Sequence, residues 1–171
     1  MSDAQKIAIY PGTFDPMTLG HLDVLKTSAA IFDEVVVALL VNPEKKPLFC
    51  EEERLAMIEE SIREVCIVNV RTISFDGLTV ELARREKAIA IIRGLRLITD
   101  YEAEFGISFN NHVLDSGIYT VFIPPLQEHV HVSSSMIREL LSFGRTDLSK
   151  YVPQAALKYI SAYEYKDLRN R

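Results

Sequence analysis

The segment Lys6–His21 reads KIAIYPGTFDPMTLGH, and it predicts a strand, a tight loop and a helix in close succession. Its first part, Ile7–Tyr10, is a short apolar run typical of a buried strand. We expect this strand to end at Pro11-Gly12, because proline removes a backbone donor and glycine permits a positive φ. In the loop that follows, Asp15-Pro16 indicates a turn and nothing more. We expect the helix to begin at His21.

This predicted junction between a strand and a helix has the form of an anion site. Gly20 would let a ligand come close to the backbone, and the four free N–H groups of the next helix would point toward it. His21 stands at the mouth of the site. A single histidine could simply cap a turn while half-buried, but its place at a phosphate-type site favours a role in the chemistry of the anion.

The composition indicates one globular domain and excludes several classes of partner. A length of 171 residues, 48% hydrophobic and 25% charged, suits one α/β domain with a sizeable core. A net charge of −5 argues against a broad surface for nucleic acid. No apolar run reaches the roughly 18–20 residues of a membrane helix, and MSDAQK has no signal-peptide core. We therefore expect a cytosolic protein without nucleic-acid or membrane partners.

Apolar runs rich in Val and Ile alternate with segments of helical period along the chain. This alternation predicts an α/β fold, a parallel five-stranded sheet with helices on both faces, in a single domain over residues 1–171. A helical segment at about residues 148–171 would pack on the body or supply a subunit contact. The expected strands are Ile7–Tyr10, Val35–Val41, Ile67–Ile73, Ala88–Ile92 and Tyr119–Ile123, and the expected helices are His21–Phe32, Glu51–Val65, Val80–Glu86 and Thr99–Leu114.

Ligands of parallel sheets bind beyond the carboxyl ends of the strands, and three further loops fall at that edge. The first, Asn42–Phe49, holds Lys45 and Lys46 between two prolines. Adjacent lysines in a loop usually only face solvent. Because the prolines stiffen this loop, either lysine is a candidate phosphate ligand that could be held in place at low entropic cost.

The second loop carries two arginines directly after the fourth expected strand. Arg93 and Arg96 flank Gly94-Leu95, at a position where guanidinium groups are difficult to bury. Guanidinium matches phosphate oxygens with two parallel hydrogen bonds, so the pair suits a polyphosphate. The alternative is a surface ion pair with Glu102 or Glu104.

The third loop, His129–Arg138, places Ser133, Ser134 and Ser135 at the start of a segment of helical period. Serine is a favoured N-cap, and one serine is enough for that purpose. Three serines followed by Arg138 therefore indicate a second anion site. His129 and His131 could bind a metal, but no cysteine or carboxylate stands at a supporting spacing.

Together these loops resemble the motifs of a known family. YPGTFDPMTLGH resembles the (H/T)-x-G-H signature of nucleotidyltransferases, and VSSSMIR resembles their ISSS/T-x-x-R signature. With KKP, IRGLR and D-Y-E-x-E, the set is similar to bacterial phosphopantetheine adenylyltransferases, over about Lys6–Tyr151. The resemblance implies a Rossmann-like fold, a homo-hexamer and Mg²⁺ with ATP as substrate. It also implies that ATP and 4′-phosphopantetheine give dephospho-coenzyme A and pyrophosphate, without a covalent intermediate.

Carried over residue by residue, the resemblance implies a role for each matching position. Thr13 would contact both substrates, and the Phe14 backbone would lie beside the nucleotide. The catalytic set would be His21, Lys45 and Arg93, with His21 on the ATP phosphates and Lys45 on the reacting phosphate. Thr79 and Arg93 would bind phosphopantetheine, and the remaining nucleotide contacts would be Gly94, Leu95, Arg96, Glu104, His129, Val130, His131, Val132, Ser133, Ser134 and Ser135; no residue is implied as a metal ligand.

Two places in the sequence differ from the usual family pattern. Leu19 stands where Asn is common, and His129-Val130-His131 stands where many members carry Trp, a small polar residue and an aromatic residue. Thr18 replaces the first His of the cytidylyltransferase H-x-G-H, which argues against that branch. Another nucleotidyltransferase, acting on nicotinamide mononucleotide or glycerol phosphate, remains an alternative, as does a non-catalytic nucleotide sensor. A dehydrogenase is disfavoured because no G-x-G-x-x-G follows the first strand.

Overall fold

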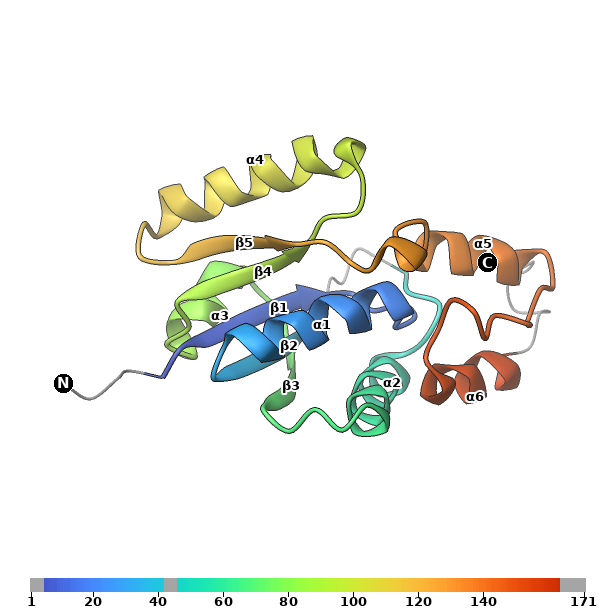
Figure 1. Ribbon diagram of the computed structural model, residues 1–171. Helices are drawn as coiled ribbons and strands as arrows, with labels where there is room; N and C mark the ends of the chain where they lie inside the picture. Colours follow the sequence, from blue (N-terminus) through green and yellow to red (C-terminus); the bar gives the residue numbers. More distant parts are fainter. Residues whose placement is uncertain (1–4, 42–45, 164–171) are drawn as a thin grey trace.

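The computed structural model describes residues 5–41 and 46–163, which form a single α/β domain around one parallel sheet (Figure 1). The strand order is β3-β2-β1-β4-β5, and neighbouring strands all pair in parallel. The predicted five-stranded sheet is therefore confirmed. The strands are β1 (Ile7–Gly12), β2 (Glu34–Leu40), β3 (Val70–Phe75), β4 (Ala90–Gly94) and β5 (Tyr119–Ile123), and the helices are α1 (Leu19–Ile31), α2 (Glu51–Glu64), α3 (Thr79–Arg85), α4 (Ile98–Leu114), α5 (Ser134–Ser142) and α6 (Gln154–Ala162).

The two faces of the sheet have separate cores, because alternate residues of each strand point to opposite faces. One core joins alternate residues of β1 and β2 to α1, α2, α5 and α6. The other joins the intervening strand residues to α3. The guanidinium of Arg84 on α3 binds the Asp115 carboxylate at 2.6 Å and so ties α3 to the end of α4. Helices on both faces were predicted and are observed. Among the described helices, none is long and apolar enough to cross a membrane.

The first strand runs further than the sequence predicted. β1 continues through Pro11 and Gly12, which align with Ala38 and Leu39 of β2. The pairing of β1 with β4 covers only Ala8 and Ile9, so one side of β1 is open beyond that point. Because proline is tolerated where a strand has an open side, Pro11 does not end the strand. The strand ends at Gly12, inside the predicted Pro11-Gly12 boundary, but it is two residues longer than the expected Ile7–Tyr10.

The C-terminal region packs on the body. It was expected to be helical from about residue 148, but α6 begins only at Gln154 and ends at Ala162. The Ala155 N–H donates to the Glu64 carboxylate at 2.9 Å, and the Tyr159 hydroxyl donates to Glu60 at 3.0 Å. These contacts fix α6 against α2 (Figure 1). Residues 164–171 lie outside the described part of the chain.

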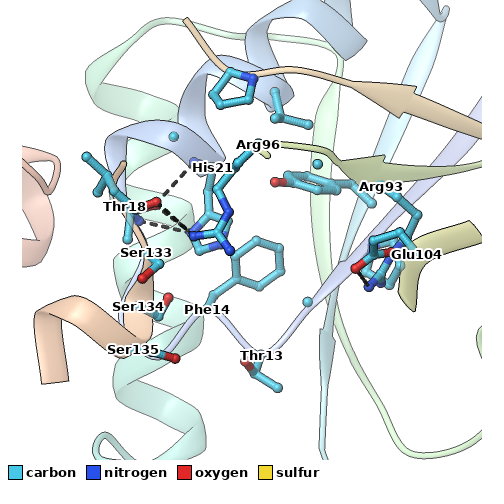
Figure 2. Close-up of a pocket in the computed structure, with 18 of the residues that line it drawn as sticks. Thr13, Phe14, Thr18, His21, Arg93, Arg96, Glu104, Ser133, Ser134 and Ser135 are labelled. Atoms are coloured by element: carbon cyan, nitrogen blue, oxygen red, sulfur yellow. Dashed lines mark hydrogen bonds and ion pairs between the residues drawn. The ribbon is translucent and has the colours of Figure 1, made fainter. Parts of the chain in front are cut away.

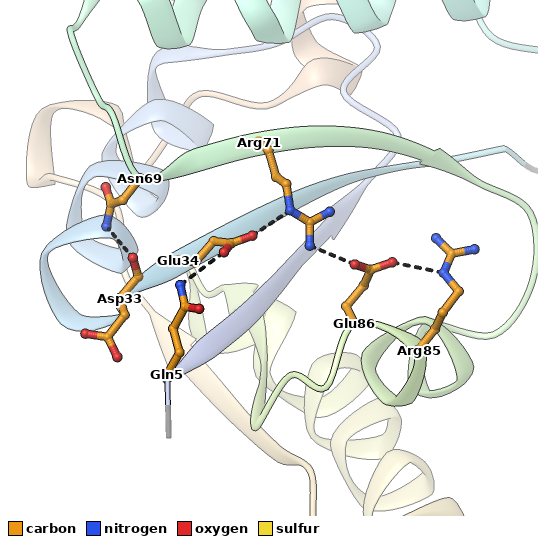
Figure 3. Close-up of polar contacts among 7 residues, drawn as sticks. All are labelled: Gln5, Asp33, Glu34, Asn69, Arg71, Arg85 and Glu86. Atoms are coloured by element: carbon orange, nitrogen blue, oxygen red, sulfur yellow. Dashed lines mark hydrogen bonds and ion pairs between the residues drawn. The ribbon is translucent and has the colours of Figure 1, made fainter. Parts of the chain in front are cut away.

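The amino ends of the strands carry an ion-pair network (Figure 3). Arg71, near the start of β3, lies between Glu34 at 2.5 Å and Glu86 at 2.7 Å. Arg85 binds the other oxygen of Glu86 at 2.9 Å, and the Gln5 amide donates to Glu34 at 3.1 Å. Each cation of this network therefore has a carboxylate partner.

Candidate functional site

A cavity of about 470 Å³ opens at the carboxyl ends of β1 and β4 (Figure 2). This is the position where parallel α/β sheets bind ligands, because the strand order reverses there. Three arginines and one glutamate are among the described residues that line the cavity, so cations prevail in this part of its wall. The predicted site residues that line it are Thr13, Phe14, His21, Arg93, Gly94, Arg96, Glu104, Val132, Ser133, Ser134 and Ser135.

The first turn of α1 forms one wall. The helix begins at Leu19, two residues earlier than predicted, and Thr18 is its N-cap. The Leu19 N–H donates to the Tyr151 carbonyl at 2.9 Å, and the His21 N–H donates to Thr18 Oγ1 at 3.2 Å. The Thr18 N–H donates to the imidazole of His21. Three of the four N–H groups expected to be free are thus engaged within the protein, and Gly20, which lines the cavity, supplies the fourth.

The imidazole of His21 is held in a defined state. Its Nδ1 accepts the Thr18 backbone N–H at 3.1 Å and lies 3.0 Å from Thr18 Oγ1. A backbone N–H can only donate, so Nδ1 is the acceptor and the neutral ring carries its proton on Nε2. Burial, with a smaller effect of the Arg96 charge, lowers the pKa of His21 from 6.5 to about 4. At neutral pH the ring is therefore an uncharged N–H donor.

The two arginines at the carboxyl end of β4, Arg93 inside the strand and Arg96 just after it, have carboxylate partners on α4. Arg93 binds Glu104 through two contacts, at 2.5 and 2.7 Å, so the ion pair considered as an alternative is present with Glu104. Arg96 binds Asp100 at 3.0 Å and donates to the Val132 carbonyl at 3.3 Å. Both guanidinium groups still line the cavity. They are cations held in place, and a phosphate ligand could bind their remaining N–H groups.

The three serines differ in what they can still offer a ligand. Ser133 is the N-cap of α5 and accepts the Met136 N–H at 3.1 Å. Ser134 donates its only hydroxyl proton to the Pro16 carbonyl at 2.9 Å. Ser135 accepts from Arg138 at 3.1 Å. Ser133 and Ser135 therefore keep a hydroxyl proton for an anion, whereas Ser134 is engaged in fixing the Pro16 segment.

Other predicted site residues do not line the cavity: Thr79, Leu95, His129, Val130 and His131. Within the described chain, His129 Nδ1 lies 2.6 Å from the buried carboxylate of Asp23, which also accepts the Leu126 N–H. His131 is exposed beside the ring of Tyr151. Lys45 lies outside the described residues, and its neighbour Lys46 is exposed.

Two buried charged residues support the site and were missed from the sequence. Asp15, read there only as a turn signal, accepts the N–H groups of Leu48 and Phe49 at 2.8 and 3.0 Å. Its carbonyl accepts from Arg138 at 2.7 Å. Arg54 of α2 donates to the Thr13 carbonyl at 2.9 Å. Arg54 could have been found from the sequence, because it shares the buried stripe of α2 with Met57, Ile58 and Ile62.

Comparisons with known proteins agree with this geometry. The family model described as cytidylyltransferase-like matches residues 9–140. The phosphopantetheine adenylyltransferase of Lachnoclostridium phytofermentans is 48% identical over 91% of this chain and 93% of its own length. The protein of the same name from Symbiobacterium thermophilum is 49% identical over 81% of this chain and 84% of its own.

Solved structures support the fold at lower identity. The nicotinic acid mononucleotide adenylyltransferase of Plasmodium falciparum, solved in complex with NaAD, superposes with a TM-score of 0.73 at 19% identity. The match covers 98% of this chain and all of that one. The likeness shows a shared fold, and the closer relatives show the family. The chain belongs to the phosphopantetheine adenylyltransferase family of cytidylyltransferase-like proteins.

Proposed function

We propose that this protein transfers the adenylyl group of ATP to 4′-phosphopantetheine, giving dephospho-coenzyme A and pyrophosphate. The observation that carries the proposal is one cavity lined by His21, Arg93, Arg96 and the first turn of α5, in a member of this family. A cavity rich in cations and N–H donors suits two phosphorylated molecules. A cytosolic location, where ATP is available, forms part of the same proposal.

The reaction is an in-line displacement at the α-phosphorus of ATP. An oxygen of the pantetheine phosphate forms the new P–O bond while the bond to pyrophosphate breaks. The phosphate dianion is already a nucleophile, so the protein needs no general base and no covalent intermediate. Its task is to position two anions and to stabilise the charge that develops, as in other phosphoryl-transfer enzymes.

His21 supplies a neutral donor at the centre of this arrangement. Its Nε2–H would donate to an ATP phosphate oxygen and bind it most strongly as negative charge develops in the transition state. Because Thr18 holds Nδ1, the ring does not reorganise when the substrate reacts. One such aligned donor is worth about 3 kcal/mol in the transition state.

The arginines and Lys45 would bring the two substrates together. Arg93 is proposed to bind the pantetheine phosphate, and Arg96 with Ser133 and Ser135 to bind the nucleotide. Lys45 is proposed to reach the reacting phosphate. Holding both substrates in line can supply roughly 7–11 kcal/mol of the rate enhancement.

Magnesium enters this proposal as part of the MgATP substrate. Among the described residues that line the cavity, Glu104 is the one carboxylate, and both its oxygens bind Arg93. Over residues 5–41 and 46–163, no three His, Cys, Asp or Glu side chains cluster as a metal site. The ion would thus be held mainly by the triphosphate and by water, as is usual for Mg²⁺.

The direct test is incubation with ATP, MgCl₂ and 4′-phosphopantetheine, with products identified by mass and pyrophosphate measured. We expect one pyrophosphate to be released for each dephospho-coenzyme A that forms. Nicotinamide mononucleotide and glycerol phosphate serve as control acceptors. Turnover with a control acceptor alone would identify another transferase, and ATP binding without pyrophosphate exchange would identify a sensor.

A homo-hexamer is also part of the proposal, supported by an apolar surface on α4. Ile98, Phe109 and Val113 are 92, 62 and 70% exposed, which is unusual for large apolar side chains on one helix. By light scattering we expect about six times the chain mass of 19.4 kDa. Phe109→Glu should give a smaller particle. Val68→Glu, at a residue 94% exposed just before β3, is the matched control and should leave the mass unchanged.

A further inference from the structure

The apolar side chain of Phe14 forms part of the cavity wall. Phe14 is 1% exposed, and its ring meets the His21 imidazole edge-on, at 5.1 Å between centroids and 72° between planes (Figure 2). It meets Tyr10 at 5.5 Å and 79°. Edge-to-face contacts of this kind are directional as well as apolar. The Phe14 ring therefore constrains the side of the imidazole that Thr18 does not hold.

The ring fits only because residue 12 has no side chain. A Cβ atom on Gly12 would lie 2.8 Å from Phe14 Cζ and 2.9 Å from Cε2. Carbon atoms in contact are normally about 3.5–4.0 Å apart. Any side chain at position 12 would have to displace the Phe14 ring, which is packed between Tyr10 and His21.

The backbone at Phe14 is strained and is fixed on both sides. Its φ is +44°, in the left-handed region that bulky residues rarely adopt. Such strain persists where surrounding contacts determine the conformation. Arg54 binds the carbonyl before Phe14, and Arg138 binds the carbonyl of Asp15 after it. These contacts turn the aromatic ring back under the end of β1.

We infer that the Phe14 side chain, seated on the bare backbone of Gly12, is a positioning residue that sets the orientation of the His21 imidazole. The inference rests on the proposed role of His21 and extends it. Phe14 touches no reacting atom in this scheme. It acts through the imidazole, so its loss should lower turnover more than substrate binding.

The experiment is a double-mutant cycle between positions 14 and 21. Phe14→Leu should lower kcat about tenfold while the KM values for both substrates change less than about threefold, because a misplaced donor weakens transition-state binding. In the His21→Ala background the same change should lower kcat less than about twofold. An equal loss in both backgrounds would overturn the inference.

Two further variants separate positioning from general damage to the core. Phe32→Leu makes the same substitution at the far end of α1, and it should destabilise the protein to a similar degree while leaving kcat within about twofold. Gly12→Ala should reduce kcat like Phe14→Leu. The double variant Gly12→Ala/Phe14→Leu should be no worse than either alone, because leucine lacks the clashing atoms. Additive losses in the double variant would contradict the inference.

A measurement without turnover separates this inference from the proposed function. Nitrogen NMR of the His21 ring reports which nitrogen carries the proton and at what pH the ring titrates. In Phe14→Leu we expect the His21 pKa to rise from about 4 toward 6.5 as the ring gains solvent, while Arg96, the charged group facing it, is unchanged. An unchanged titration would overturn the inference even if adenylyl transfer is observed. If the His21 titration shifts in a protein that shows no adenylyl transfer, the inference about Phe14 still holds.

Discussion

The two ends of the sheet both gather arginines, but in different settings. At the amino end, Arg71 and Arg85 face Glu34 and Glu86, and the charges balance on an open surface (Figure 3). At the carboxyl end, three arginines and His21 line a cavity, with a single glutamate among the residues that the structure describes there. Exposed ion pairs of the first kind contribute little to stability. The difference shows that arginines alone do not mark a candidate site, because the cavity at the carboxyl end also holds N–H and hydroxyl groups that can still donate to a ligand.

The largest effect on the cavity is expected when its central donor, the His21 imidazole, is removed. His21→Ala should lower kcat by about 10²–10³-fold, as expected for loss of one donor aligned on developing charge. The melting temperature should stay within a few degrees. Steady-state assays of pyrophosphate release would measure the effect, with His112→Ala, an exposed histidine on α4, as control. A rate within a few-fold of wild type would remove His21 from the mechanism.

Acid offers a second test, on stability. The pKa of His21 is lowered to about 4 in the folded protein and is near 6.5 in the unfolded chain. Between these values the unfolded state takes up a proton that the folded state does not. The free energy of unfolding should therefore fall as pH drops from 6.5 toward 4, by at most about 3 kcal/mol from this group.

Urea unfolding of the wild type and of His21→Asn across this range would measure that contribution. The variant lacks the group, so its free energy of unfolding should fall less steeply with decreasing pH. Above about pH 6.5 the slopes of the two curves should be equal. Parallel curves throughout would mean that the ring titrates normally.

A smaller effect is expected when an arginine of the cavity is replaced by the other cation. Arg93→Lys keeps the charge but loses the two-point contact with Glu104 and any two-point contact with phosphate. We expect kcat/KM for phosphopantetheine to fall about tenfold, with the KM for ATP less affected. Initial rates at varied phosphopantetheine concentrations give this kcat/KM. An unchanged kcat/KM would leave Arg93 with a purely structural pairing.

The smallest effect is expected at the other end of the sheet. Arg71→Ala removes the central cation of the network shown in Figure 3 and should cost less than about 1 kcal/mol in the free energy of unfolding. Activity should not change. Urea unfolding in low and high salt, together with the rate assay, would detect either a larger loss or an effect at the distant site.

The sequence was sufficient for the layout and insufficient for the hydrogen-bonding state of the site. Apolar runs and helical periods identified all five strands of the sheet, because both signals are local. Loops at the carboxyl ends then had to lie at one edge. The hydroxyl of Ser134 and the guanidinium of Arg138, however, bind Pro16 and Asp15, more than a hundred positions away in the chain. No periodicity encodes such contacts.

The same limit explains the differences at Pro11 and at the first helix. Pro11 remains in a strand because β4 stops pairing with β1 before that point, a property of the neighbour. The helix starts at Leu19 because the Tyr151 carbonyl and the Thr18 side chain accept its first N–H groups. His129 was assigned to the nucleotide only by its place in the family motif, and the structure pairs it with Asp23 outside the cavity.

The bond between the Leu19 N–H and the Tyr151 carbonyl limits how far the chain can be shortened. The family match stops at residue 140, and every predicted site residue lies before that point. A fragment that ends at residue 140 would still contain the matched family region and every predicted site residue. It would nevertheless lack Tyr151, whose carbonyl accepts the Leu19 N–H at the start of the helix that carries His21. It would also lack α6, which packs on α2. We therefore expect the smallest folded unit to extend past residue 140 and to include Tyr151 and α6.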